Sequence, residues 1–312
     1  MKLLPFMLSA LMPITALAGE TVEQLIEVPK GNTVYIENDQ GKVTVIGWDN
    51  AQMKVSGELD DRAKGYSLKT VGKRTEFVVE MPRNYKHKDE EGSKLTIYVP
   101  KSNHVNLETI NADLDISDLE KGINLDTVNG DVEVSNVQGD ISLDTVNGNI
   151  NSTNLNGNIR FETVNGDIKD SQSVGEIRFE AVNGNLNSLT QSSDIRIETV
   201  NGDVAIKANE INDIEITTVG GEVEVSMTEL SKGASVQAES VNGDIEFKFP
   251  KSLSAEFDIN AHAGGKIKNN LSTDKVKKAK YGPSSSLEFQ LNGGDVEVEI
   301  DTVNGRVELK YN

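Results

Sequence analysis

Apolar and polar residues alternate along most of the chain with the period of two that is typical of β-strands. Ile159, Phe161 and Thr163 fall on one side of an extended chain, while Arg160 and Glu162 fall on the other. The runs rich in Val, Ile, Thr and Phe are short, are bounded by Gly and Asn, and show no helical period. The pattern predicts an all-β protein.

A repeat with the motif Thr-Val-Asn-Gly-Asp/Asn-Ile/Val organises the middle of the chain. Its asparagines lie 18 residues apart from Asn111 to Asn201, and steps of 19 and 22 lead on to Gly220 and Asn242. Asn-Gly supplies the backbone angles of a tight turn, and stacked asparagines can hydrogen-bond one another. The predicted structural turn ladder consists of Asn111, Asn129, Asn147, Asn165, Asn183, Asn201, Asn242, Asn304, Gly130, Gly148, Gly166, Gly184 and Gly202.

A weaker glycine signal divides each unit into two strand-plus-turn halves of about nine residues. Two topologies fit this pattern: an antiparallel meander with Asn-Gly hairpins, or a β-solenoid in which each unit is one coil. We favour the solenoid, because coils that stack in register must have equal lengths and equal turns. The expected fold is a parallel β-solenoid with about 18 residues per coil, flanked by irregular β caps.

The remaining segments differ from the repeat in composition. Residues 1–18 combine Lys2, an apolar run and Ala16-Leu17-Ala18, which predicts a secretory signal peptide rather than a membrane anchor. We therefore expect export to the periplasm or the cell surface of a bacterium, with no transmembrane segment after cleavage. Residues 19–100 are predicted to form an N-terminal β-strand cap region, 101–250 the solenoid, and 251–312 irregular coils and a cap, with the far cap at 287–310.

Composition excludes several classes of protein. The chain has 50 Asp+Glu against 31 Lys+Arg, a net charge of −19, which argues against binding to nucleic acid. The absence of cysteine excludes disulfides and thiolate metal sites, and only three histidines are present. No HExxH, GxSxG, Walker or dinucleotide-binding motif occurs. We expect no catalysis, no cofactor and no metal; a β-helix enzyme acting on polysaccharide remains the least favoured alternative.

The residue before Thr-Val-Asn-Gly is acidic in six consecutive units, at Glu108, Asp126, Asp144, Glu162, Glu180 and Glu198. Stacked about 4.8 Å apart, such carboxylates need cations, solvent or partners. Arginine lies two residues earlier in the last three of these units but not in the first three. Glu108, Asp126 and Asp144 are therefore a candidate face for binding a cation or an amine, and a solvated face is the alternative.

For three further sets of residues, a structural role is favoured over a binding role. The aspartates after the turn glycines suggest a calcium-binding β-roll, but the required Gly-Gly-x-Gly-x-Asp spacing is absent. The threonines of the repeat share the strand side of Ile and Phe, so we expect them to point inward and not to form an ice- or sugar-binding array. Trp48, the single tryptophan, is expected to pack within the N-terminal cap region.

The recurring TVNGD units, the segment VTVIGWDN at 43–50 and the segment LTIYVPK at 95–101 resemble one bacterial family. It is the putative-adhesin family of β-strand-repeat proteins of unknown function. The resemblance implies a right-handed β-solenoid, an envelope location and no known catalysis, and some relatives are associated with envelope-stress systems. We interpret the chain as an adhesin-like structural or interaction module with an unknown protein or polysaccharide ligand. A periplasmic scaffold or sensor linked to envelope stress is the alternative.

Overall fold

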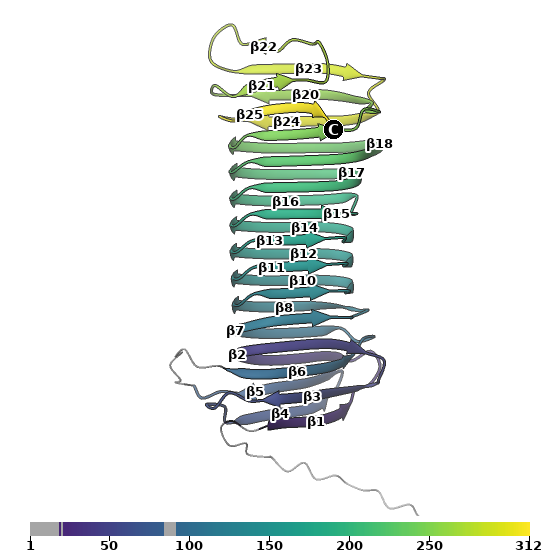
Figure 1. Ribbon diagram of the computed structural model, residues 1–312, viewed down its shortest axis with the longest axis vertical. Coiled ribbons are helices and arrows are strands. Elements are labelled where there is room, and N and C mark those ends of the chain that lie inside the picture. Colours follow the sequence, from purple (N-terminus) through teal and green to yellow (C-terminus); the bar gives the residue numbers. More distant parts are fainter. Residues whose placement is uncertain (1–18, 20, 84–91) are drawn as a thin grey trace, which may run out of the picture.

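The computed structural model describes residues 19, 21–83 and 92–312, so the expected signal peptide at 1–18 lies outside the described residues. The described residues form one long stack of β-strands, with the N-terminal strands at one end and β20–β23 at the other (Figure 1). They contain no helix, which confirms the all-β prediction. Consequently, no helix in the described ranges is long and apolar enough to cross a bilayer.

Each central coil consists of one long and one short strand. The long strands are β8 (Gly122–Asn129), β10 (Gln138–Asn147), β12 (Asn156–Asn165), β14 (Val174–Asn183) and β16 (Asp194–Asn201). The short strands are β9 (Val132–Ser135), β11 (Ile150–Thr153), β13 (Ile168–Ser171) and β15 (Leu186–Thr190). Neighbouring coils pair in parallel, so that Asp144 lies opposite Glu162 and Ile150 opposite Ile168. The spacing of 18 residues in the sequence is thus the register of the sheet in these coils.

Two longer strands absorb the irregular steps of the repeat. β17 (Val204–Gly220) and β18 (Val223–Asn242) each follow most of a coil and pair in parallel with each other. Their register shifts between Ile211 and Asp213, where the pairing changes from Ile211–Leu230 to Asp213–Ser235. The extra residues are accommodated at this corner, and the Gly220–Asn242 pair restores the alignment of the repeat.

The C-terminal strands are inserted into the stack rather than added to its end. β24 (Val296–Thr302) pairs in parallel with both β18 and β20 (Ala255–Ala261). β25 (Arg306–Tyr311) likewise lies between β19 (Ile245–Phe249) and β21 (Lys266–Asn269).

The expectation of a far cap at 287–310 is therefore corrected. The end of the stack is made by β20 and β21 with β22 (Lys277–Lys278) and β23 (Ser285–Leu291), where β23 runs antiparallel to β20. The physical reason is that the last copy of the repeat keeps its turn sequence. Asn304 can therefore stack on Asn242, to which its side chain donates a hydrogen bond of 3.0 Å.

A similar insertion occurs at the N-terminal end. β2 (Thr33–Trp48) pairs in parallel with β7 (Val105–Ser117) on one edge and with β5 (Arg74–Glu80) and β6 (Ser93–Pro100) on the other. β3 (Gln52–Glu58) runs antiparallel to β6 and to β1 (Thr21–Glu27), and β4 (Gly65–Val71) runs antiparallel to β5. Trp48 packs here against Tyr98, with ring centroids 5.2 Å apart, and its indole N–H donates to the Gln52 carbonyl.

The core is a narrow column of aliphatic side chains between the long and short strands. Phe161 and Phe179 stack inside it with ring centroids 4.8 Å apart. The repeat threonines point inward, as strand parity predicted: Thr109, Thr127, Thr145, Thr163 and Thr199 are all buried. Burying these small side chains lets the coil remain thin, which is consistent with the 5% aromatic content.

One buried polar cluster interrupts this column. On the ladder of the short strands, Ser152, Asp170 and Ser188 follow Val134 and precede Ile206. The Asp170 carboxylate accepts hydrogen bonds from the hydroxyls of Ser152 (2.7 Å), Ser173 (2.5 Å) and Ser188 (2.9 Å). Burial raises the pKa of Asp170, and these hydroxyls oppose the shift.

Candidate functional site

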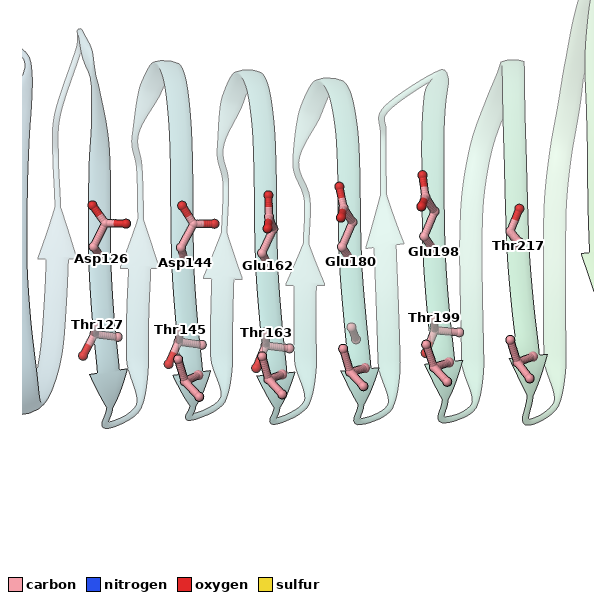
Figure 2. A pocket seen from close by; sticks show the side chains of 16 residues that line it. Asp126, Thr127, Asp144, Thr145, Glu162, Thr163, Glu180, Glu198, Thr199 and Thr217 are labelled. Atoms are coloured by element: carbon pink, nitrogen blue, oxygen red, sulfur yellow. The ribbon is translucent and has the colours of Figure 1, made fainter.

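A groove runs along the outward face of the long strands. One segment of about 550 Å³ extends from Asp126 to Val219, and a second segment of about 520 Å³ extends from Glu37 to Val128. The two segments share Asp126 and Thr127, so the groove is continuous over the coils between β2 and β17. Figure 2 shows its regular construction: the carboxylates of successive coils form one row, which Thr217 continues, and threonines form a second row below it, with Ala181 in place of threonine beside Glu180.

The first component of the groove is the acidic row, which consists of Glu108, Asp126, Asp144, Glu162, Glu180 and Glu198. Its members pair in register from strand to strand, one rung per coil. The pairing of β2 with β7 places Glu37 opposite Glu108, which adds one more rung at the N-terminal end. The sequence repeat predicted the six members of this row, but not the addition of Glu37.

Arginines neutralise the C-terminal half of the acidic row. Arg160 lies in contact with Glu162 and 3.3 Å from Glu180. Arg178 is 2.7 Å from Glu180 and 3.4 Å from Glu198. Arg196 is 3.0 Å from Glu198, and 2.7 Å from Glu215 of the next coil. Each guanidinium thus bridges the carboxylate of its own coil and that of its neighbour.

The N-terminal half, which we call the anionic stretch, consists of Glu37, Glu108, Asp126 and Asp144. Among the described residues, none of the four forms an ion pair with a Lys, Arg or His side chain. Burial, followed by the charge of Glu108, raises the pKa of Asp126. Burial and the charges of Glu162 and Asp126 raise the pKa of Asp144 to about 6, although Arg160 acts in the opposite direction. The like charges of this stretch therefore repel one another in the folded protein.

The second component of the groove is the valine row, which consists of Val128, Val146, Val164, Val182, Val200 and Val219. The first five valines are each 40% exposed, and Ile110 extends the row toward the N-terminus. The repeat pattern alone did not mark these side chains as part of a binding surface. The sequence does predict that they point outward, because the valine of Thr-Val-Asn-Gly lies on the same side of the strand as the acidic residue two positions earlier. The groove thus combines a charged row with an apolar one.

The asparagines of the turns form a ladder beside the valine row. The Asn129 side-chain amide donates to Asn111 at 2.6 Å, and the same bond is repeated from coil to coil up to Asn201, with distances of 2.8–3.0 Å. The adjoining glycines let the coils approach closely. A Cβ on Gly166, for example, would lie 1.9 Å from the Gly148 carbonyl oxygen.

The residues after the turn glycines have a different role from calcium binding. An oxygen of Asp131 accepts the backbone N–H of Asn149 at 2.9 Å, and an oxygen of Asn149 accepts that of Asp167 at 2.9 Å. Because Asp and Asn both supply this acceptor, they can alternate along the row. No group of three His, Cys, Asp or Glu side chains in the described part of the chain is arranged to hold a metal ion.

Gly220 interrupts the asparagine ladder and provides a test of its contribution. It lies in register between Asn201 and Asn242, and a Cβ there would meet no atom closer than 3.8 Å. We expect Gly220→Asn to raise the free energy of unfolding by about 1 kcal/mol. It restores one hydrogen-bonded rung, and asparagine leaves the unfolded chain less conformational freedom than glycine does. Chemical denaturation measures this. Gly220→Ala, which replaces the same glycine without supplying an amide, is the control, and an equal change in both variants would contradict the prediction.

Comparison with known proteins places this architecture in a family. Among solved structures, similar chains are a putative cell adhesion protein from Clostridium sporogenes ATCC 15579 (10% identity, 94% of this chain and 100% of that chain, TM-score 0.25) and a putative adhesin from Bacteroides fragilis NCTC 9343 (12%, 93% and 97%, TM-score 0.41). A third is a putative adhesin from Parabacteroides merdae ATCC 43184 (11%, 74% and 97%, TM-score 0.42). No curated protein matches the chain. The model of the Toastrack DUF4097 family matches residues 23–310, and the chain therefore belongs to that family.

Proposed function

We propose that the protein is a non-catalytic, exported interaction module of the bacterial cell envelope or surface, which binds an extended protein or polysaccharide along its groove. The observation that carries this proposal is the continuity of the groove, whose acidic and valine rows repeat the same chemistry in successive coils. From Glu108 to Glu198 the six rungs span about 24 Å at about 4.8 Å per coil. A surface of this length and regularity suits an elongated ligand better than a small one.

The repetition also supports a non-catalytic role. Acid–base catalysis of glycoside hydrolysis uses one pair of carboxyl groups on either side of the scissile bond. Here a carboxylate recurs in coil after coil, and three of the rungs are bridged by arginine. We further propose that the coils wind in a right-handed sense with about 18 residues each, and that residues 19–100 and 251–312 protect the open strand edges at the two ends.

Binding to isolated cell envelopes tests the proposal. We expect Val164→Ser combined with Val182→Ser to weaken envelope binding about tenfold, because two rungs of the valine row lose their apolar contact. The matched control is Val174→Ser with Leu189→Ser, which alters two exposed apolar side chains outside the groove. Equal binding by the two double variants, with both folded, would refute the groove as the binding surface.

Protease treatment of intact cells tests the location. An internal tag beside Tyr281, which is 84% exposed, should be cleaved on intact cells if the protein is on the surface. Cleavage only after the outer membrane is permeabilised would indicate the periplasm and favour the scaffold or sensor role. Retention of the full-length chain in the cytoplasm would overturn the exported assignment. A periplasmic marker protein controls for leakage.

A further inference from the structure

The arginines of the groove show how this face accepts a cation. Each guanidinium of Arg160, Arg178 and Arg196 reaches carboxylates on two successive rungs, at distances from 2.7 to 3.4 Å where the contacts are of ordinary length. A planar group with several N–H donors fits this arrangement, because it can donate to two carboxylates at once. The carboxylates in the C-terminal half of the acidic row are therefore neutralised by arginines of the same chain.

The anionic stretch has the same rungs without the arginines. Ser142 lies in register with Arg160, and Asn124 and Asn106 continue that row toward the N-terminus. These shorter side chains cannot supply a positive charge to Asp144, Asp126 or Glu108. Burial and, after it, the charges of neighbouring carboxylates raise the pKa values of Asp126 and Asp144, and a cation bound beside them would offset both effects.

Buried acceptor atoms without donors provide a second, independent observation. The Oδ1 of Asp144, a residue that lines the groove, is buried and has no hydrogen-bond partner. The Oδ1 of Asn106, in the row of Asn124 and Ser142, is in the same condition. A buried acceptor that lacks a donor destabilises the folded protein, so a donor bound here would be stabilising.

The valine row and the distribution of charge indicate what carries the cation. A metal ion or a small polyamine makes no use of exposed valines, whereas a polypeptide can place apolar side chains on the valine row and basic ones on the carboxylates. Residues 101–250 hold 27 of the 50 acidic residues and only 9 basic ones, which favours the approach of a basic partner and disfavours an acidic one.

We propose that the anionic stretch binds the guanidinium and ammonium groups of a basic segment of a partner protein, which bridge successive rungs as the chain's own arginines do farther along the groove. This proposal rests on the proposed function, because it specifies the partner of the same groove. It assigns the anionic stretch as the charged contact and the neighbouring Ile110, Val128 and Val146 as the apolar contact.

The test measures binding of a short synthetic peptide of arginine and valine to the full chain by fluorescence anisotropy. We expect saturable binding that weakens as salt is added. Asn124→Arg with Ser142→Arg should weaken it about tenfold or more, because internal guanidinium groups would occupy the rungs. Asp126→Asn with Asp144→Asn should have a similar effect. The control, Glu133→Gln with Glu176→Gln, removes the same charge from exposed positions outside the groove and should leave binding within about twofold.

Two results would overturn the proposal. An equal loss of binding in the control variant would mean that the peptide responds only to overall charge. Displacement of the peptide by calcium or spermidine at the ionic strength where sodium has no effect would indicate a simple cation site. The proposed function can fail separately: it stands if the valine variants lose envelope binding while the arginine-insertion variant retains it. The melting temperature of each variant shows that folding is preserved.

Discussion

Gly166→Ala should lower the free energy of unfolding by about 4 kcal/mol, a loss far larger than ordinary glycine substitutions cause. The added Cβ would lie 1.9 Å from the carbonyl oxygen of Gly148 and 2.6 Å from its carbonyl carbon. Both are backbone atoms of the preceding coil, so no side-chain rotation can relieve the overlap. The backbone N–H of Gly166 also donates to the Asn183 carbonyl at 3.1 Å, which holds the residue against the following coil. The coils can separate only by breaking the ladder on one side.

Chemical denaturation of this variant beside Gly282→Ala separates crowding from backbone strain. Gly282 has a φ of +105°, but a Cβ there would meet no atom within 4 Å. We therefore expect Gly282→Ala to cost only about 1 kcal/mol, from the unfavourable φ alone. If Gly166→Ala costs no more than Gly282→Ala, the close approach of the coils does not limit stability. A failure of Gly166→Ala to accumulate as folded protein, with Gly282→Ala folded normally, would agree with the prediction.

Asp170→Ala should cost about 3 kcal/mol, the second-largest effect that we expect. The substitution leaves the buried hydroxyls of Ser152, Ser173 and Ser188 without their common acceptor. The neighbouring coils suggest the compensating change, since Val134 and Ile206 occupy the same ladder. Replacing a buried charge and all of its partners with apolar side chains of similar volume is often neutral or stabilising. The variant that combines Asp170→Val with Ser152→Val, Ser173→Ala and Ser188→Val should therefore be at least as stable as the wild-type protein.

Measurements at two pH values give this prediction a second check. Burial raises the pKa of Asp170 above its ordinary value of 3.8, so the folded state holds the proton more tightly than the unfolded state does. The contribution of this carboxyl group to stability must then decrease as the pH rises from 3.8 through the higher pKa of the folded state. Relative to Asp170→Asn, the wild-type protein should be more stable at about pH 4 than at pH 7. A cost for Asp170→Ala below about 1 kcal/mol, or strong destabilisation of the variant with all four substitutions, would show that the buried polar cluster does not contribute to stability as we infer.

Within the region of regular repeats, the orientation of the side chains could be predicted from the sequence in some detail. A parallel stack places equivalent residues above one another, so one strand-parity rule applied to one unit describes all of them. The inward threonines followed from this rule, as did the relation of Glu162, Glu180 and Glu198 to the arginines two residues earlier. The valine row obeys the same rule, and we missed it because valine in a strand is ordinarily assigned to the core.

Outside that region, local pattern was not sufficient. The far cap was misplaced because strand propensity at 287–310 shows that strands form there but not which edge they join. Asn304 and Asn242 are 62 residues apart, and their contact depends on the intervening β20–β23 folding over the end of the stack. The added rung at Glu37 has the same origin, because it requires β2 to pair with β7 across the whole segment that contains β3–β6. Competition among several open strand edges decides such pairings, and that competition is a property of the assembled stack.

The sequence by itself determined that the chain is all-β, that its central units are equivalent, and that most of them carry an outward carboxylate, an inward threonine and an Asn-Gly turn. These are local properties, which depend on alternation and on the backbone preferences of Asn and Gly. Only the tertiary structure decided that the last coil is inserted beneath β20 and β21 and that the first complete coil contributes Glu37 to the groove. It also decided that each arginine of the acidic row reaches the carboxylate of the next coil in addition to that of its own. These features depend on contacts between residues far apart in the chain, because backbone pairing at an open strand edge accepts any segment that folding brings into register.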